Sequence, residues 1–588
     1  MKKRLFVIFT LLLSLFMLSN CDLEGFIPPF RTPDPITVLD SYEPQEDVDW
    51  LIMMYVDGDN DLHDSLYLDI NEVERALYNY ENIPGEKPKV KVVALWDGWK
   101  ISGSNIGSVS TQILELGPDP NLTDQGLYQL CENTKDLTVT ALTPLEPYTS
   151  SNNWINYSFI KKSAEVNMGN PKTLENFLKW AEIYYPNAKH KILQFSNHGG
   201  GPRSALGGSE RRAICWDYTS DSEYAFLKTK DVSDALSKAG YGESQNGVSN
   251  QLDMLIFDLC LGASIEDSYQ FRNYAKYMLA SANNIPGYGL DYTKILENIP
   301  SLSKDKPLID FGIGIIDDYK EFYIDNDSKN RTDLWEKEIN QWKKDLINQG
   351  INTPTKVNIN PVDMAKFYGF VTDSNYFPCT LSLIDLSKIK TVAEKIDDLA
   401  SIYLNNIDYF SKTTITIKNT NKEEIKVYLK DLLKGFLECS PYFEFYKIKY
   451  NGTFNYLHDI GYFTANICEF FKDKVAGIGG NFVTTAQDVA AALGGAIVYT
   501  WREAPPSSLN NDKTCEIVGT LTSPVTNKDF SLYYGNNLPF GITIAGASIG
   551  VRQNKLVDLP LEDFYSSDLD FAIDTSWDEL LKSYFITQ

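Results

Sequence analysis

The chain has 588 residues, which is enough for a large core and more than one domain. Apolar residues make up 43% and aromatic residues 13% of the sequence, and these fractions exclude an intrinsically disordered protein. The formal net charge is −25 and no basic patch stands out, so we expect no nucleic-acid partner, because phosphate binding requires clusters of Lys and Arg.

Residues 1–21 are predicted to be an export signal. Three basic residues precede an apolar run from Leu5 to Leu18, which is too short to span a bilayer comfortably. The run leads into Ser19-Asn20-Cys21, which resembles a bacterial lipobox, although Asn20 departs from the usual small residue. We therefore expect an exported lipoprotein of the cell envelope, anchored to a bacterial membrane through a lipid on Cys21. The alternatives are an ordinary cleaved signal or an uncleaved anchor.

The rest of the chain divides into three predicted parts. Residues 22–48 contain five prolines and are expected to form an extended tether. Residues 49–400 alternate strand and helix patterns, which is typical of βαβ units. This predicts an α/β core with a mostly parallel sheet flanked by helices. Residues 401–588 are expected to form an α+β extension that packs on the core.

Strands are predicted wherever short apolar runs are bounded by turn residues. These runs lie at Trp50–Val56, Val90–Trp96, Thr111–Leu116, the segment after Lys191, Met254–Phe257, Tyr274–Ser281, Thr380–Asp385, Ala496–Trp501 and Gly541–Ala545. Ser65 and Thr173 are predicted to cap two helices with apolar residues at helical spacing. Further helices are expected before Gly240, near 331–348 and over Ser387–Leu404, with the remainder of 300–375 in loops.

Two of these strands carry the residues of greatest chemical interest. The run Met254–Phe257 is followed at once by Asp258 and Cys260, and the run after Lys191 ends in Asn197-His198 and three glycines. In open α/β sheets the ligand crevice lies beyond the carboxyl ends of the strands. If the two strands are neighbours, the His198 imidazole and the Cys260 thiol meet there, as a cysteine nucleophile requires. The backbone amides of Gly199 and Cys260 are expected to form an oxyanion hole.

The acidic turn Asp57–Asp61 raises the question of a metal. An EF-hand loop would need Gly and Glu at the positions of Leu62 and Leu68. We therefore expect an ordinary turn, and calcium binding is the alternative. The sequence requires no cofactor and predicts no metal site.

Within Asn167–Tyr292 the sequence resembles the clostripain family of cysteine peptidases, and weaker similarity extends from Trp50 to the end. The resemblance lies in Met168-Gly169-Asn170, Asn197-His198-Gly199-Gly200-Gly201, Asp258-Leu259-Cys260-Leu261 and Pro286-Gly287 through Asp291-Tyr292. It implies a caspase-like (clan CD) α/β fold and a His198–Cys260 dyad that hydrolyses peptides or proteins through an acyl-enzyme.

The resemblance also implies that acidic residues read a Lys or Arg before the scissile bond. Asp258 lies two residues before Cys260, and strand alternation puts it on the same side. We expect Asp258 and Tyr288 to contact the substrate; the alternative for Asp258 is a helix cap or bonds to loop amides. The chain departs from the family at Leu259, usually Ala, and at Tyr288, where an acid is expected. The competing function is therefore a catalytically weak or inactive surface-binding lipoprotein.

Overall fold

The computed structural model describes residues 47–60, 62–98, 111–118, 166–201, 214–217, 226–243, 249–283, 285, 289–302, 304–324, 380–418, 424–438, 453–502, 516–522, 529–534, 541–552, 555–559 and 563–585. The predicted signal, nearly all of the tether, Cys21, Tyr288 and the helix near 331–348 lie outside these residues.

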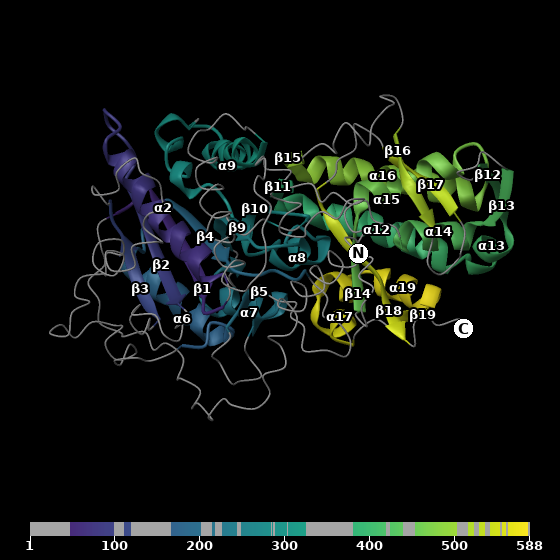
Figure 1. Ribbon diagram of the computed structural model, residues 1–588, viewed down its shortest axis with the longest axis horizontal. Helices are drawn as coiled ribbons and strands as arrows, with labels where there is room; N and C mark the ends of the chain where they lie inside the picture. The colour runs from purple at the N-terminus through teal and green to yellow at the C-terminus, as the bar shows by residue number, and fades with distance from the viewer. Residues whose placement is uncertain are drawn as a thin grey trace, which may run out of the picture.

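An eight-stranded sheet organises the described part of the chain (Figure 1). Its order is β15-β11-β10-β9-β4-β1-β2-β3, and β10, β9, β4, β1 and β2 run parallel. The edges are antiparallel, with β3 on β2 and β11 between β10 and β15. The strands span Trp50–Gly58 (β1), Val90–Gly98 (β2), Gln112–Leu116 (β3), His190–Ser196 (β4), Leu252–Asp258 (β9), Ala275–Ala280 (β10), Thr380–Asp385 (β11) and Ile497–Arg502 (β15). The predicted mixed, mostly parallel α/β sheet is confirmed.

Helices cover both faces of this sheet. On one face, α2 (His63–Glu81) packs on β1 and α9 (Pro307–Ile324) packs on β11 and β15, and Ile52, Met54 and Val56 belong to the apolar cluster on this face. On the other face, α6 (Pro171–Tyr184), α7 (Thr229–Lys238), α8 (Ile265–Phe271) and α12 (Ile389–Leu404) pack with the alternate residues of β1. Because both faces are buried, β1 and β9 contain continuous apolar runs, Trp50–Val56 and Met254–Phe257, instead of an alternating pattern.

The C-terminal part adds helices and small sheets beside the β11–β15 edge (Figure 1). Its helices are α13 (Ile407–Lys412), α14 (Leu429–Glu438), α15 (Ile460–Phe471), α16 (Ile478–Ala496), α17 (Asp563–Asp568), α18 (Asp570–Asp574) and α19 (Trp577–Phe585). The sheets pair β12 (Thr414–Lys418) with β13 (Glu424–Tyr428), β16 (Glu516–Thr522) with β17 (Asp529–Tyr534), and β18 (Thr543–Arg552) with β14 (Thr453–Asp459) and β19 (Lys555–Leu559). The division near residue 400 stays a prediction, and β15 places one strand of the later region in the main sheet.

Short elements complete the described architecture. Two ribbons pair β5 (Ile214–Trp216) with β6 (Phe226–Leu227) and β7 (Gly242–Glu243) with β8 (Ser249–Asn250). The 3₁₀ turns are η1 (Tyr292–Lys294), η2 (Ile299–Ser301) and η3 (Leu386–Lys388).

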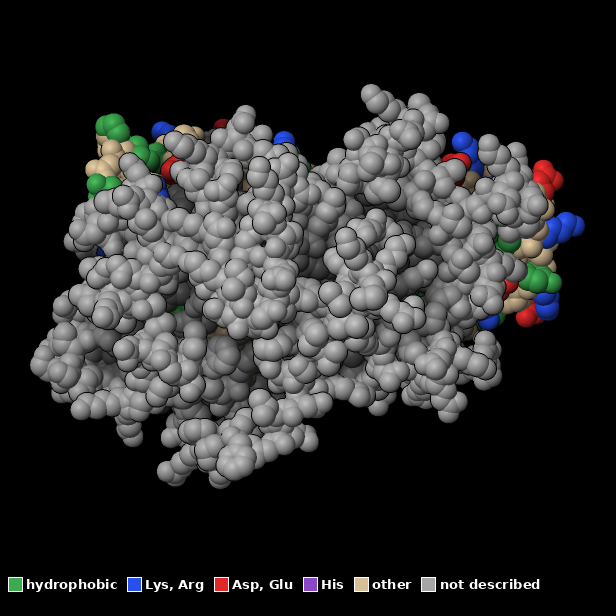
Figure 2. All heavy atoms as spheres, in the orientation of Figure 1, with side chains coloured by type: hydrophobic (Ala, Val, Ile, Leu, Met, Phe, Trp, Pro, Cys, Tyr) green, Lys and Arg blue, Asp and Glu red, His purple; other side chains and the backbone are tan. Residues whose placement is uncertain are grey.

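The described surface carries charges of both signs. Figure 2 shows Lys or Arg and Asp or Glu side chains intermixed at the edge of the C-terminal part, where α13, β12 and β13 lie. There Lys412 pairs with Asp408 at 2.7 Å. Among the described residues, no helix is long and apolar enough to cross a membrane.

Three local predictions are wrong. The helix α2 begins before Ser65, so Ser65 does not cap it. Thr173 lies inside α6 and does not cap it; the cap is Asn170, whose side chain accepts a hydrogen bond from the Lys172 amide. Pro171 occupies the first turn, where no amide donor is needed. Finally, α9 occupies a region that we expected to be mostly loop, because the apolar face of this helix packs on the sheet.

Candidate active site

The candidate site lies at the carboxyl ends of β4 and β9, which are neighbouring parallel strands. Ser196 is in register with Asp258, so His198 and Cys260 each follow two residues after paired positions. The prediction that these strands are neighbours is confirmed. Carboxyl ends of parallel strands open onto one rim, and both candidate catalytic residues follow such ends.

The main chains of the two rim segments approach one another closely at Gly199. A Cβ added to Gly199 would lie 2.1 Å from the carbonyl oxygen and 2.8 Å from the amide nitrogen of Cys260. These distances are shorter than any van der Waals contact, so no larger residue fits without moving the backbone. Glycine is therefore required at this position by the approach of Cys260.

A strained turn presents Cys260. The next residue, Leu261, has a φ of 62°, which is uncommon for a residue other than glycine. Its amide donates to the Asn283 carbonyl at 3.0 Å, and the Ala263 amide donates to the Ser281 carbonyl at 2.8 Å. These bonds hold the turn against the segment that follows β10.

The Cys260 thiol is partly buried, and its Sγ lies 3.7 Å from the carbonyl oxygen of Ile285. Burial raises the pKa of the thiol to about 11, and the negative charge of Asp258 adds to this rise. Main-chain hydrogen bonds at Ile285, Gly199 and Cys260 itself act in the opposite direction. A thiol with this pKa is protonated at neutral pH, so nucleophilic chemistry needs a base to remove its proton.

The His198 backbone is fixed by the residue before it. The side-chain oxygen of Asn197 accepts a hydrogen bond from the His198 amide. The Nδ2 of the same Asn197 side chain donates a hydrogen bond to the Asp57 carbonyl at the end of β1. The imidazole lies against the ring of Trp216, with 5.4 Å between the ring centroids. The Trp216 carbonyl in turn accepts a 2.8 Å hydrogen bond from Asn60. Three separate segments thus support His198.

The Asp258 carboxylate is turned inward and bonds the chain that follows β10. Its Oδ2 accepts hydrogen bonds from the Tyr292 hydroxyl at 2.8 Å and from the Leu290 amide at 3.2 Å. Burial raises the pKa of Asp258 to about 6, whereas the two hydrogen bonds lower it. The hydrogen bond from the Leu290 amide matches the alternative role considered for Asp258, which is to bond loop amides. Contact between Asp258 and the substrate stays a prediction.

Sequence reasoning missed several neighbours of the site. It assigned no role to Trp216, which lies against His198, nor to Asp69 and Glu72 on α2. Asp69 interacts electrostatically with Asp258 and with Glu72. No local signal identifies them, because each is distant in sequence from the residue that it approaches. Tyr292 appeared only as part of a motif that resembles a known family.

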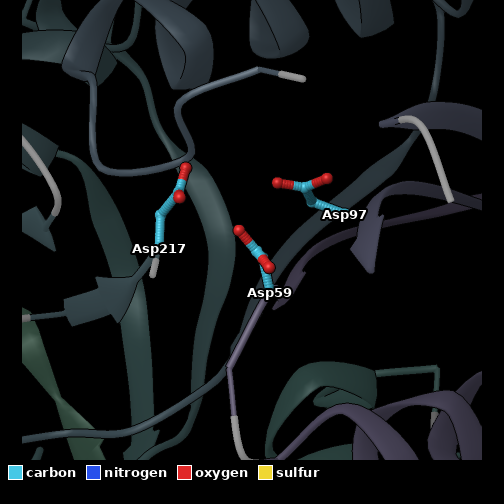
Figure 3. Close-up of side chains that lie close together, drawn as sticks. All are labelled: Asp59, Asp97 and Asp217. Atoms are coloured by element: carbon cyan, nitrogen blue, oxygen red, sulfur yellow. The ribbon is translucent and has the colours of Figure 1, made fainter. Parts of the chain in front are cut away.

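Three buried carboxylates form a candidate cation site at the carboxyl ends of β1, β2 and β5. Asp59, Asp97 and Asp217 point toward a shared space (Figure 3), and each offers an oxygen within 4.8 Å of the others. Oxygen ligands of this kind suit Ca²⁺, which takes six to eight of them, so these residues would supply part of a shell. The predicted acidic turn contributes Asp59 to this group, while Asp61 lies outside the described residues.

The sheet order defines an α/β protein with a mostly parallel sheet, and a thiol and an imidazole follow two neighbouring parallel strands at its rim. A family model described as "Clostripain family" matches residues 54–584. Since this match spans most of the sequence, the chain belongs to the clostripain family.

Sequence identity to individual relatives is low. The chain is 28% identical to clostripain of Hathewaya histolytica over 256 residues, which is 42% of this chain and 41% of that protein. The chain therefore spans less than half the length of this curated relative. A secreted C11 cysteine protease from Bacteroides thetaiotaomicron, solved with an irreversible peptide inhibitor, has 14% identity and a TM-score of 0.44 over 90% of this chain and 99% of the other. An inactive zymogen C11 protease from Parabacteroides distasonis has the same values.

Proposed function

We propose that the protein is an exported cysteine endopeptidase in which Cys260 is the nucleophile and His198 the acid and base. The observation that carries this proposal is the register of β4 and β9 combined with the close approach of Gly199 to Cys260. A thiol and an imidazole on adjacent segments can exchange a proton. The family membership supports the same class of reaction, with peptides or proteins as substrates.

The reaction proceeds in two halves. His198 takes the thiol proton as the sulfur attacks the scissile carbonyl, and it then delivers that proton to the departing amine as the C–N bond breaks. Water hydrolyses the resulting thioester with His198 as the base, and the proton returns to the sulfur. The amides of Gly199 and Cys260 stabilise the oxyanion of each tetrahedral intermediate, a contribution of about 3 kcal/mol in comparable sites.

The proposed specificity is a relaxed preference for Lys or Arg before the scissile bond. Asp258 supplies negative charge two residues from the nucleophile, and Tyr288 supplies a ring face and a hydroxyl. A single carboxylate suits the point charge of Lys, whereas strict selection of Arg gains from a second acid. A cation over the tyrosine ring gains about 0.5–2 kcal/mol.

The proposed location is the cell envelope, with the chain exported and anchored to a bacterial membrane by a lipid. A lipid on Cys21 would anchor the chain, and the proline-rich segment 22–48 would hold the peptidase away from the bilayer. One acyl chain gives only marginal binding, so stable anchoring requires more than one chain at this cysteine.

A thiol-directed activity probe and a peptide-hydrolysis assay test the proposal on the full chain. Cys260→Ala and His198→Ala should each abolish turnover without lowering the melting temperature, and Cys260→Ala should also abolish labelling. Cys468→Ala is the matched control, because Cys468 is a free, partly buried thiol far from the rim, and it should retain activity. Turnover in Cys260→Ala would overturn the assignment. A wild-type chain without labelling or turnover would favour the surface-binding lipoprotein instead.

A further inference from the structure

The Asp258 carboxylate lies in a buried environment with other acids. Asp258 is 5% exposed, and Asp69 and Glu72 on α2 are 2% and 4% exposed. The groups around Asp258 are Asp69 from α2, the Tyr292 hydroxyl from η1 and the Cys260 thiol from its own segment. Glu72, also on α2, interacts with Asp69 and accepts a hydrogen bond from the Tyr292 amide. Two carboxylates that interact in such a place cannot both ionise easily, so ionisation of one opposes ionisation of the other.

Hydrogen-bond donors determine which carboxyl group ionises. Asp258 Oδ2 accepts from Tyr292 and from the Leu290 amide. Asp69 Oδ2, by contrast, is buried and receives no hydrogen bond from any part of the chain that the structure describes. Donors stabilise a charged acceptor, and burial without donors favours its neutral form. Accordingly, burial together with the charges of Asp258 and Glu72 raises the pKa of Asp69 well above its usual value.

Tyr292 is itself held in place from three directions. Its amide donates to Glu72 Oε2 at 3.0 Å, and its hydroxyl accepts a hydrogen bond from Gln194 Nε2 at 2.7 Å. The Ser196 Oγ also lies 3.3 Å from this hydroxyl. Asp258 Oδ2, at 2.8 Å, is the nearer and the charged acceptor, so the hydroxyl proton is directed at Asp258. Gly289 completes the arrangement, because a Cβ there would lie 2.4 Å from Asp258 Oδ2.

We propose that Tyr292 is a specificity-determining residue: its hydroxyl keeps Asp258 ionised and fixed beside the nucleophile, while Asp69 remains neutral. This inference rests on the proposed function, since it assigns the charge that would read a basic side chain. Tyr292 acts through Asp258 and is a positioning residue. The negative charge of the pocket is then a property of the Asp258–Tyr292 pair.

The test compares two peptide substrates that differ only in Lys or norleucine before the scissile bond. The ratio of their kcat/KM values is measured from pH 5 to 9. Ionisation of the dyad affects both substrates equally, so it does not change this ratio. The variants are Tyr292→Phe and Asp69→Asn. Tyr499→Phe is the matched control, because Tyr499 also donates to an aspartate, Asp317 at 2.9 Å, but on the surface.

Wild type should show a ratio that favours Lys and that falls below about pH 6, as Asp258 is protonated. Tyr292→Phe should move this fall upward by about one to two pH units and lower the ratio at pH 7 by about two- to tenfold, since a hydrogen bond to a charged group is worth that much. Asp69→Asn should leave the profile in place, because a neutral group replaces a neutral group.

The outcomes separate the two proposals. A wild-type ratio near one at every pH would refute the preference for basic residues. A wild-type preference that Tyr292→Phe leaves unshifted would overturn the role of Tyr292 while leaving the preference intact. In Asp69→Asn, the Lys-to-norleucine ratio could instead be higher than in wild type and fall at a lower pH. That result would show that Asp69 is charged in wild type, and it would overturn the proposal that Asp69 holds the proton.

Discussion

Replacing Gly199 with alanine probes the contact on which the candidate site depends. The added Cβ would lie 2.1 Å from the Cys260 carbonyl oxygen, and real Cβ atoms essentially never approach closer than 3.0 Å. Both neighbouring atoms belong to the backbone of Cys260, so a side-chain rotation cannot relieve the contact. The two rim segments must therefore separate by about 1 Å.

A displacement of this size has a large expected effect on catalysis. A misplacement of about 1 Å costs about 10²-fold in rate, which corresponds to about 2.7 kcal/mol of lost transition-state stabilisation. The change moves the amides of Gly199 and Cys260 away from the oxyanion, so the loss should appear mainly in kcat. We therefore expect Gly199→Ala to lower kcat/KM about 100-fold in a peptide-hydrolysis assay.

Gly495→Ala is the matched control for this prediction. Gly495 lies in α16, and an added Cβ there would meet no heavy atom within 4 Å. Alanine favours a helix over glycine by about 1 kcal/mol, so this variant should keep full activity and melt at or above the wild-type temperature. Wild-type kcat/KM in a folded Gly199→Ala protein would refute the reasoning, because the close approach of the two segments could not then be essential for catalysis.

Three further predictions concern the nucleophile, the pocket and the anchor. Because burial raises the pKa of Cys260 to about 11, alkylation of this thiol by iodoacetamide in His198→Ala should keep rising up to pH 10, whereas a plateau near neutral pH in this variant would contradict it. Tyr288→Asp should sharpen cleavage after Arg relative to Lys by supplying a second acid, and unchanged selectivity in a positional-scanning substrate profile would count against this pocket. Cys21→Ser should abolish labelling by a fatty-acid analogue and release the protein from membranes; a variant that still labels and pellets would refute the lipid anchor.

The elements around the site could be predicted from the sequence because their signals are local. The runs Trp50–Val56 and Met254–Phe257 are apolar over their whole length, which is what burial on both faces requires, and Val90–Trp96 is apolar except for Lys91 near its start. Each run lies in a strand of the sheet. Helix ends were less certain. Asn170 and Ser65 are both suitable caps by residue type, and only the path of the chain decides which one caps a helix.

The sequence by itself determined the type of sheet and the two segments that carry His198 and Cys260. Only the tertiary structure decided which residues, distant in sequence, lie around the site. Trp216 reaches His198, Tyr292 reaches Asp258, and Asp59 joins Asp97 and Asp217, although none of these pairs shares a local pattern. Likewise β15, over a hundred residues after β11, enters the sheet beside it. The physical reason is that hydrophobic periodicity is a property of a few consecutive residues, whereas such contacts arise when burial of the whole core offsets the entropy of closing long loops.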